Sequence, residues 1–139
     1  MDGNFAECVD FVIDELEGGD RIVTDSGQVT KFGIAAKYHP GLDIPSLTRA
    51  QATDIYERDY WLKTGCDTLA WPMDLIVFDA AVNQGVTFAA SLKMTAIDYV
   101  EALMMRIEQY AHLVTARPGL RIYMHGWVNR VLKIWWHVR

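Results

Sequence analysis

The feature that most constrains the fold is a nearly all-apolar segment between Pro72 and Gly85. Proline is typical of the first turn of a helix and glycine of its end, so this segment is predicted to be a helix. Its apolar residues include Leu75, Ile76, Phe78, Ala81 and Val82. A helix that is apolar on almost every side must be covered by other elements. We therefore expect it to be the central, buried helix of the domain.

Helical spacing of apolar residues predicts further helices elsewhere in the chain. They are expected near residues 5–16, 48–61, 87–114 and 120–139. Gly27 is typical of a turn, and residues 29–34 of a short strand or strand-like bend, so a small hairpin is predicted there. A chain of 139 residues, 51% of them hydrophobic, can bury one core. The expected fold is mainly α, an α+β domain over residues 1–139 with about five helices and a small β-hairpin.

The first predicted helix ends in an acid, Glu17, which is followed at once by two glycines. Glycines let the chain leave a helix sharply and let a bulky ligand approach the backbone. Asp25 and Thr30 follow within the predicted hairpin. Cleavage of a glycosidic bond needs one acid to protonate the leaving oxygen and a second acidic group to activate water or stabilise positive charge. The pattern indicates such a site, although Asp25 could instead form an Asx turn and Thr30 could be an ordinary strand residue.

Five motifs occur in a recognisable order along nearly the whole chain. They are ELEGG (15–19), D-x-G-x-x-T-K-F-G-I (25–34), Y-x-x-x-Y-W (56–61), V-F-D-A-A-V-N-Q-G (77–85) and G-W-V-N-R-V (126–131). Together they resemble the glycoside hydrolase family 108 N-acetylmuramidases, which include phage endolysins and belong to the lysozyme-like superfamily. The chain departs from the family pattern at residues 20–22 and lacks the wall-binding insertion of longer relatives, so it resembles the catalytic module alone.

The resemblance implies a peptidoglycan hydrolase that cleaves between N-acetylmuramic acid and N-acetylglucosamine and causes host lysis. It implies Glu17 as general acid, Asp25 as base or electrostatic partner, and Thr30 as the residue that positions water. No cofactor is implied. In a phage setting it also implies a holin, which would release the enzyme from the host cytoplasm to the periplasm and cell wall.

Asp79 and Asn83 lie four residues apart on one face of the apolar helix, where unpaired polar groups are costly. Either they form an internal hydrogen-bond network behind Glu17, which we favour, or Asn83 contacts sugar. Tyr60 and Trp61 offer flat faces on which pyranose rings can stack, although aromatic residues at helical spacing are often core residues. We predict Tyr60, Trp61 and Asn83 as substrate-binding residues.

Other chemistries find little support in the sequence. The four histidines do not form H-E-x-x-H or another recognisable ligand spacing, so no metal site is predicted. No serine-nucleophile, phosphate-loop or dinucleotide motif occurs. Cys8 and Cys66 are expected to be two semi-buried thiols, not a disulfide.

Charge is distributed unevenly along the chain. All 18 acidic residues lie within residues 1–108 together with eight of the 13 basic ones, which gives formal charges of −10 before and +5 after residue 108. Residues 120–139 therefore resemble a cationic amphipathic helix, able to meet an anionic outer-membrane surface or lipopolysaccharide. The alternative function is a membrane- or lipopolysaccharide-active wall-binding protein with weak or no hydrolase activity. In the structural alternative, Trp127 and Val131 are buried in the domain, and the arginines either form a solvated face or pair with the acidic part of the chain.

The overall charge of −5 argues against nucleic acid as a partner. The first residues are acidic and no apolar segment follows them, so no signal peptide is predicted. No apolar run is long enough to predict a membrane span.

Overall fold

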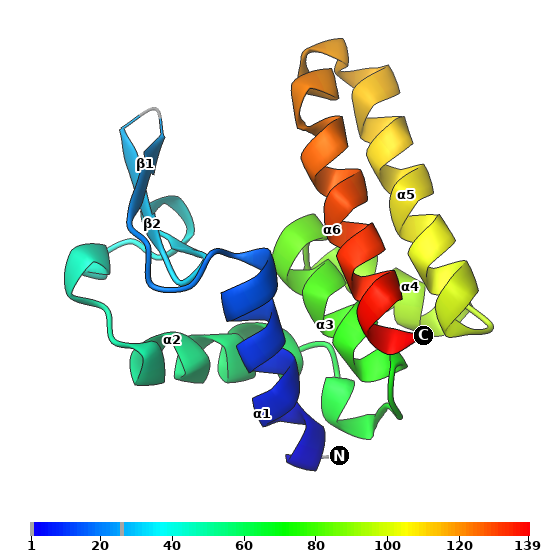
Figure 1. The fold of residues 1–139 in the computed structure, drawn as a ribbon, viewed down its shortest axis with the longest axis horizontal. Coiled ribbons are helices and arrows are strands. Elements are labelled where there is room, and N and C mark those ends of the chain that lie inside the picture. The colour runs from blue at the N-terminus through cyan, green and yellow to red at the C-terminus, as the bar shows by residue number, and fades with distance from the viewer. Residues whose placement is uncertain (1, 26) are drawn as a thin grey trace.

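The computed structural model describes residues 2–25 and 27–139. Within them, six α-helices accompany one three-stranded antiparallel sheet. The elements are α1 (Asp2–Phe11), β1 (Val23–Asp25), β2 (Gln28–Lys31), β3 (Ile34–Ala35), α2 (Arg49–Tyr56), α3 (Met73–Gln84), α4 (Val86–Thr95), α5 (Tyr99–Ala116) and α6 (Met124–Val138). Figure 1 shows the sheet and α2 on one side of α1 and α3, and the long pair α5 and α6 on the other. The mainly α, α+β fold predicted from the sequence is confirmed.

The apolar helix lies at the centre, as its composition predicts. In α3 every residue from Asp74 to Ala81 is buried, and the helix contacts α1, α4 and α5. The ring of Phe78 packs at about 6 Å or less from those of Phe5, Tyr56 and Trp61, which come from the elements around it. Because α3 has no solvent-facing side along this stretch, a polar side chain here must find its partners inside the protein.

The hairpin is larger by one strand than predicted. Residues 29–34 do not form one strand, because the chain reverses at Phe32 and Gly33, which have φ of 55° and 79°. Two successive residues with positive φ are typical of a type I′ turn between antiparallel strands. The register pairs Lys31 with Ile34 on its two sides.

The predicted fourth helix, residues 87–114, is in fact two helices. The chain leaves the helical conformation after Thr95, and α5 begins at Tyr99. The side chain of Asp98 accepts a hydrogen bond from the amide of Glu101, whose carboxylate accepts one from the amide of Ile97. Asp98 is thus the N-cap of α5, and Glu101 reaches back to the amide of the residue before the cap, so the D-x-x-E sequence marked a helix start that the apolar periodicity concealed. The described residues therefore form six α-helices, where about five were expected.

Two helices end in a π-helical turn, a feature that the sequence did not predict. Residues Val12–Leu16 continue α1 as a π turn, and residues Glu57–Trp61 continue α2 in the same way. Each π turn inserts an extra residue into the helical ladder and so changes the direction of the side chains that follow. Glu17 comes directly after the first turn, and Tyr60 lies within the second.

The C-terminal segment completes the core. Of the predicted helix at 120–139, Met124–Val138 form α6, and a 3₁₀ turn over Pro118–Tyr123 precedes it. Val131 and Ile134 are buried, and α6 packs along α5. In residues 2–25 and 27–139, no helix is long and apolar enough to cross a membrane.

Candidate active site

Glu17 is placed by the way in which the first helix ends. Its amide donates to the carbonyl of Val12 at 2.9 Å, which closes the π turn, and the amide of Gly19 donates to the carbonyl of Ile13 at 2.8 Å. Gly18 and Gly19 both have positive φ, at 81° and 70°. The chain therefore turns away immediately after the acid, in the manner that the glycine pair predicted.

Gly33 lets the sheet approach Glu17 closely. A Cβ atom on Gly33 would lie 2.7 Å from Cγ of Glu17, and it would also collide with the hydroxyl of Tyr56. That hydroxyl donates to the carbonyl of Phe32 at 2.7 Å, so α2 holds the turn in place. Both the positive φ and the lack of space require glycine here, and the Phe32–Gly33 turn forms one wall beside the acid.

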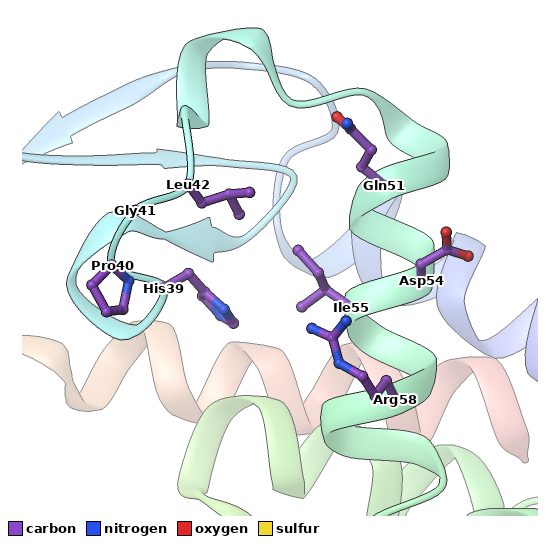
Figure 2. Close-up of a pocket in the computed structure, with 8 residues that line it drawn as sticks. All are labelled: His39, Pro40, Gly41, Leu42, Gln51, Asp54, Ile55 and Arg58. Atoms are coloured by element: carbon purple, nitrogen blue, oxygen red, sulfur yellow. The ribbon is translucent and has the colours of Figure 1, made fainter.

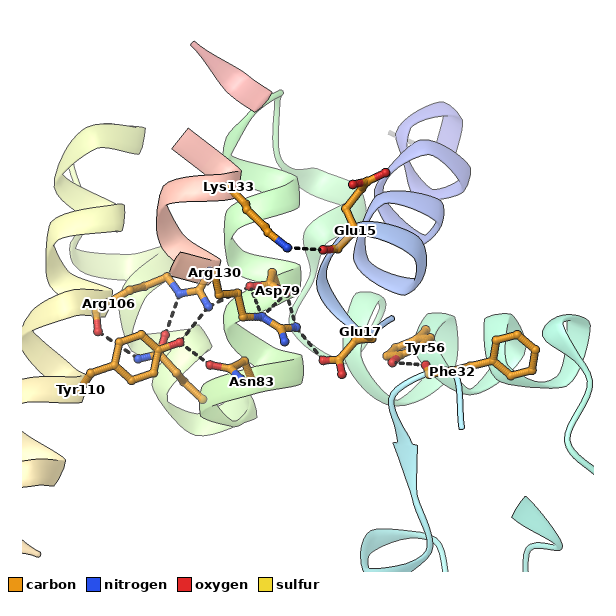
Figure 3. Close-up of polar contacts among 11 residues, drawn as sticks. Glu15, Glu17, Phe32, Tyr56, Asp79, Asn83, Arg106, Tyr110, Arg130 and Lys133 are labelled. Atoms are coloured by element: carbon orange, nitrogen blue, oxygen red, sulfur yellow. Dashed lines mark hydrogen bonds and ion pairs between the residues drawn. The ribbon is translucent and has the colours of Figure 1, made fainter. Parts of the chain in front are cut away.

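On its other side Glu17 binds a cation from the last helix. Nη2 of Arg130, on α6, lies 2.7 Å from Oε1 of Glu17 and 2.7 Å from Oδ1 of Asp79 on α3. Figure 3 shows the guanidinium of Arg130 between the two carboxylates. The side chain of Glu17 is 21% exposed and that of Asp79 is 0% exposed. One guanidinium thus joins a carboxylate that solvent can reach to one that it cannot.

Asp79 is fully occupied by arginines. Oδ2 of Asp79 lies 2.8 Å from Nη2 of Arg106, a buried residue of α5, and Nε of Arg130 donates to both of its oxygens at 3.1 and 3.2 Å. Nε of Arg106 in turn donates to Oε1 of Gln84 at 2.6 Å. Asp79 therefore belongs to an internal hydrogen-bond network behind Glu17, which was the favoured alternative to sugar contact.

The two carboxylates have opposite pKa shifts. Burial raises the pKa of Glu17 above its ordinary value, and the neighbouring Arg130 only partly offsets this. Burial would also raise the pKa of Asp79, but Arg130 and Arg106 together outweigh it and hold that pKa below its ordinary value. Separation of neighbouring carboxyl pKa values is how a site keeps one group protonated and the other ionised.

Asn83 connects this network to the surface. Its Oδ1 accepts a hydrogen bond from the hydroxyl of Tyr110 on α5. Among the residues that the structure describes, none accepts a hydrogen bond from its Nδ2. Burial raises the pKa of Tyr110, so its hydroxyl stays a donor. Asn83 therefore has both a structural partner and an amide group that a ligand can reach.

Asp25 and Thr30 lie on the same face of the sheet. Asp25 is opposite Gln28 in the β1–β2 pair, and Thr30 is two residues further along β2. Opposed residues and residues two apart point to one face, so Asp25 and Thr30 share it, while Val29 points to the other face and packs against the core. Asp25 is exposed near the Gly27 turn, whereas Thr30 lies near the end of β2 that leads to Gly33. The structure thus places Thr30 nearer to the turn that contacts Glu17.

Two hollows flank Asn83. One, of about 410 Å³, is lined by Leu16, Asn83, Gly126, Trp127, Asn129, Arg130 and Lys133. The other, of about 380 Å³, is lined by Tyr38, Tyr60, Ala81, Val82, Asn83, Gln84, Gly85 and Val86. Glu17 itself lines neither hollow, and the first is connected to it through Arg130, which binds its carboxylate. Tyr60 and Asn83, both predicted to bind substrate, line one hollow together.

Trp61 does not lie beside Tyr60 at the surface. Its side chain is 1% exposed and packs with its ring centroid 5.3 Å from that of Phe5 and 5.5 Å from that of Phe78. Tyr60 and Trp61 are neighbours in the π turn and point in different directions, so that Trp61 is buried while Tyr60 is half-buried. Trp61 is therefore a core residue in this structure, contrary to its prediction as a cleft-lining residue.

A third hollow, of about 430 Å³, lies between α2 and the loop at residues 39–42 (Figure 2). Its lining includes His39, Asp54 and Arg58 and shares no residue with the contacts around Glu17. Burial lowers the pKa of His39.

Within the described part of the chain, no three histidine, cysteine, aspartate or glutamate side chains are grouped as metal ligands. Cys8 and Cys66 are free thiols, and they are fully buried where semi-buried thiols were expected.

Sequence reasoning missed Arg106 and Arg130 as parts of the site. Arg130 stands in the G-W-V-N-R-V motif, but its charge was assigned to a cationic surface. The available signal was Asp79, because a carboxylate in an all-apolar helix requires buried cations as partners. Arg130 pairs with two acids from the first part of the chain, as the structural alternative for the C-terminal segment predicted.

Comparison with known proteins identifies the family of the chain. The model of the family described as Glycosyl hydrolase 108 matches residues 11–85, more than half of the chain. The match includes Glu17, the sheet and α3, and it ends before the helices that carry Arg106 and Arg130. No curated protein and no solved structure matches the chain. The chain therefore belongs to glycosyl hydrolase family 108 and is a peptidoglycan-degrading glycoside hydrolase.

Proposed function

We propose that the protein is an N-acetylmuramidase in which Glu17 is the general acid. The observation that carries the proposal is the setting of Glu17, a partly exposed carboxylate with a raised pKa that is bound by Arg130, a lining residue of the first hollow. A carboxyl group with a raised pKa keeps its proton to higher pH and can donate it to a leaving glycosidic oxygen. As the proton leaves, the new carboxylate forms 2.7 Å from the guanidinium of Arg130, which stabilises its charge.

The second acidic group is Asp25, and Thr30 positions the water. Their common face on the sheet supports this pairing, because a carboxylate and a hydroxyl on one face can bind the same water molecule. Asp79 is closer to Glu17 but is a poor candidate. It is fully buried and both of its oxygens are occupied by arginines, so neither sugar nor water reaches it.

The sugar chain lies across the two hollows that meet at Asn83. Tyr60 offers a ring face in one hollow, and the amide of Asn83 reaches both. Stacking on an aromatic ring and hydrogen bonding to an amide are contacts that N-acetylated pyranoses accept. Since Trp61 is buried, Tyr60 and Asn83 are the two substrate contacts that we retain from the sequence analysis.

The biological role proposed is that of an endolysin whose catalytic domain spans residues 1–139. It is held in the host cytoplasm, reaches the periplasm and the peptidoglycan when a holin opens the inner membrane, and causes lysis. α6 is proposed as a point of contact with an anionic outer-membrane surface. Trp136 on that helix is 63% exposed, and the guanidinium of Arg139 lies 3.9 Å from its ring centroid. An exposed indole next to a cation suits a lipid headgroup surface.

Analysis of digested peptidoglycan tests the proposed bond specificity. Purified sacculi are digested, the new reducing ends are reduced with borohydride, and the muropeptides are identified by mass spectrometry. A muramidase leaves N-acetylmuramitol at these ends. N-acetylglucosaminitol would instead identify a glucosaminidase, and 1,6-anhydro ends would identify a lytic transglycosylase. The matched controls are Glu17→Gln, which should release no ends, and Glu15→Gln, an exposed acid of the same turn, which should behave as wild type.

A further inference from the structure

The hollow beside Arg130 differs in charge from the one beside Tyr60. It is lined by two cationic side chains, Arg130 and Lys133, both from α6. As far as the described residues go, neither hollow has a carboxylate in its lining, and the Tyr60 hollow has no cation either. Two sugar-sized hollows on either side of Asn83 are therefore electrostatically unlike, and this difference can discriminate between two kinds of sugar.

Of the two cations, Lys133 is the one whose N–H groups a ligand can reach. The guanidinium of Arg130 is only 10% exposed, and it already contacts Glu17 and Asp79 inside the protein. Lys133 is exposed, and its Nζ donates to the backbone carbonyl of Glu15 at 3.1 Å. A carbonyl fixes the position of the ammonium group but does not neutralise it, and two further N–H groups stay available. Figure 3 shows Lys133 above Arg130, reaching towards the turn that carries Glu17.

The rest of this hollow suits a sugar ring. Trp127 lies in its lining, and its ring stacks on Tyr110 at 4.8 Å between centroids with an interplanar angle of 14°. Tyr110 also donates to Asn83, so the indole and the amide are held by one residue of α5. Asn129 adds a second amide to the lining. An aromatic face, two amides and one uncompensated cation form a site for an N-acetylated sugar that bears a negative substituent.

We infer that this hollow is the subsite for the N-acetylmuramic acid residue, and that Lys133 binds the carboxylate carried by its 3-O-lactyl group or attached peptide. The uncharged N-acetylglucosamine residue then occupies the Tyr60 hollow. The two alternating sugars of peptidoglycan differ in this acidic substituent, so a cation in one hollow sets the register of the chain across Glu17. The inference rests on the proposed function, because it assigns the substrate of the same site.

A binding experiment with two matched ligands tests the role of Lys133. Short glycan strands are stripped of peptide by an amidase, which leaves a free lactyl carboxylate on each muramic residue. In a second sample these carboxylates are converted to neutral methylamides by carbodiimide coupling. Dissociation constants are measured by calorimetry on Glu17→Gln protein, so that the strands are not cut during the titration. The variants, all in this background, are Lys133→Gln, Lys133→Arg and Arg139→Gln.

Lys133→Gln is expected to weaken binding of the carboxylate strands by about three- to fivefold, the size of one exposed ion pair. It should leave binding of the methylamide strands unchanged. Lys133→Arg should restore the preference for the charged strands, and Arg139→Gln, at the end of the same helix and outside the hollow, should match the background protein. The preference should also shrink as salt is added, because the pair is exposed.

Two results would overturn the inference. One is equal binding of charged strands by Lys133→Gln and by the background protein. The other is equal weakening of both ligands by Lys133→Gln, which would mean that Lys133 acts only by holding the carbonyl of Glu15. Failure of the proposed function appears elsewhere, as an absence of N-acetylmuramitol ends in the digest made by wild-type protein, so the two failures are distinguishable.

Discussion

Glu17 and Asp79 bind the same nitrogen of Arg130 but lie in two different regions of the molecule. Asp79 lies in the buried centre, on α3, with a second guanidinium from Arg106. Glu17 lies at the boundary between the helices and the sheet, with Arg130 as its one salt-bridge partner among the described residues. Burial opposes ionisation of both carboxyls, and the number of cations decides the outcome, since the pKa falls at Asp79 and rises at Glu17. The comparison separates a carboxylate that supports structure from one suited to proton transfer.

The sharpest way to test that separation is to remove the proton of Glu17 without changing its shape. Glu17→Gln should lower the rate of peptidoglycan hydrolysis by about 10²- to 10⁴-fold, the usual contribution of general acid catalysis. Helical circular dichroism should be unchanged, because Gln can still accept a hydrogen bond from Arg130. Turbidity loss of purified sacculi measures the rate. Retention of more than about a tenth of wild-type activity would remove Glu17 from the mechanism.

The opposite result is expected at Asp79, where the effect should be on stability. Asp79→Asn leaves the buried guanidinium of Arg106 without its carboxylate and removes one of the two carboxylates that contact Arg130, so it should lower the free energy of unfolding by about 3 to 5 kcal/mol. Because the folded pKa of Asp79 is lowered, its stabilisation is present above the ordinary value of 3.8 and is lost as pH falls through the folded pKa. Urea unfolding of wild type and variant should therefore converge in acid. A pH-independent difference would mean that Asp79 is not ionised in the folded protein.

A third comparison is between Asp25, in β1, and Asp20, an exposed acid in the loop before it. Asp25→Asn should reduce activity by about 10²-fold, the lower end of the range for a lost acid–base group, without a change in melting temperature. Asn serves an Asx turn as well as Asp does, so the variant separates chemistry from turn geometry. Asp20→Asn is the matched control. If Asp20→Asn were inactive and Asp25→Asn normal, Asp20 would be the second carboxylate.

A change at Arg130 should shift the pKa of Glu17, and it also removes one of the two cations that lower the pKa of Asp79. In the proposed mechanism Glu17 acts in its protonated form, so activity is expected below its pKa and is lost as pH rises through it. Arg130 lowers that pKa, and its removal in Arg130→Gln should move the alkaline limb of the rate profile to higher pH by about one unit. Arg130→Lys keeps a charge and should lie closer to wild type. A limb at the same pH in all three proteins would show that it belongs to another group.

The smallest effect is expected at the exposed end of α6. Trp136→Ser combined with Arg139→Glu should weaken binding to lipopolysaccharide-containing vesicles by about fivefold at low salt, and less at high salt. Hydrolysis of purified peptidoglycan should be unchanged. Met94→Ser removes another exposed apolar side chain, from α4, and serves as the control. If the double variant bound vesicles as wild type does at every salt concentration, α6 would have only a structural role.

The parts of the fold that depend on neighbours in the chain were predictable from the sequence. The apolar α3, the acid before the glycine pair and the turn at Gly27 all follow from local patterns, and each is present. Asp98 and Glu101 also indicated the start of α5, but the continuous apolar periodicity led to the prediction of a single helix. The π turns were not predictable, because they depend on packing around α3 and have no sequence pattern of their own.

Most of the site beyond Glu17 depends on pairs that are far apart in the chain. Arg130 lies 51 residues from Asp79, and no periodicity shows that a cation in an exposed-looking helix points inwards. Tyr60 and Trp61 illustrate the same limit on a smaller scale. Both are large aromatic residues in one turn, and only the position of Phe5 and Phe78 decides that Trp61 is the buried one.

The ion pair between Glu17 and Arg130 joins the end of the first helix to the last helix, and this has a consequence for partial chains. A ribosome makes the acid early and its guanidinium partner late, after more than a hundred intervening residues. A fragment that stops before residue 124 lacks Arg130, leaves Asp79 with one cation and loses the buried side chains of Val131 and Ile134. Unfinished or clipped products should therefore lack hydrolase activity, which is expected only once α6 has been made.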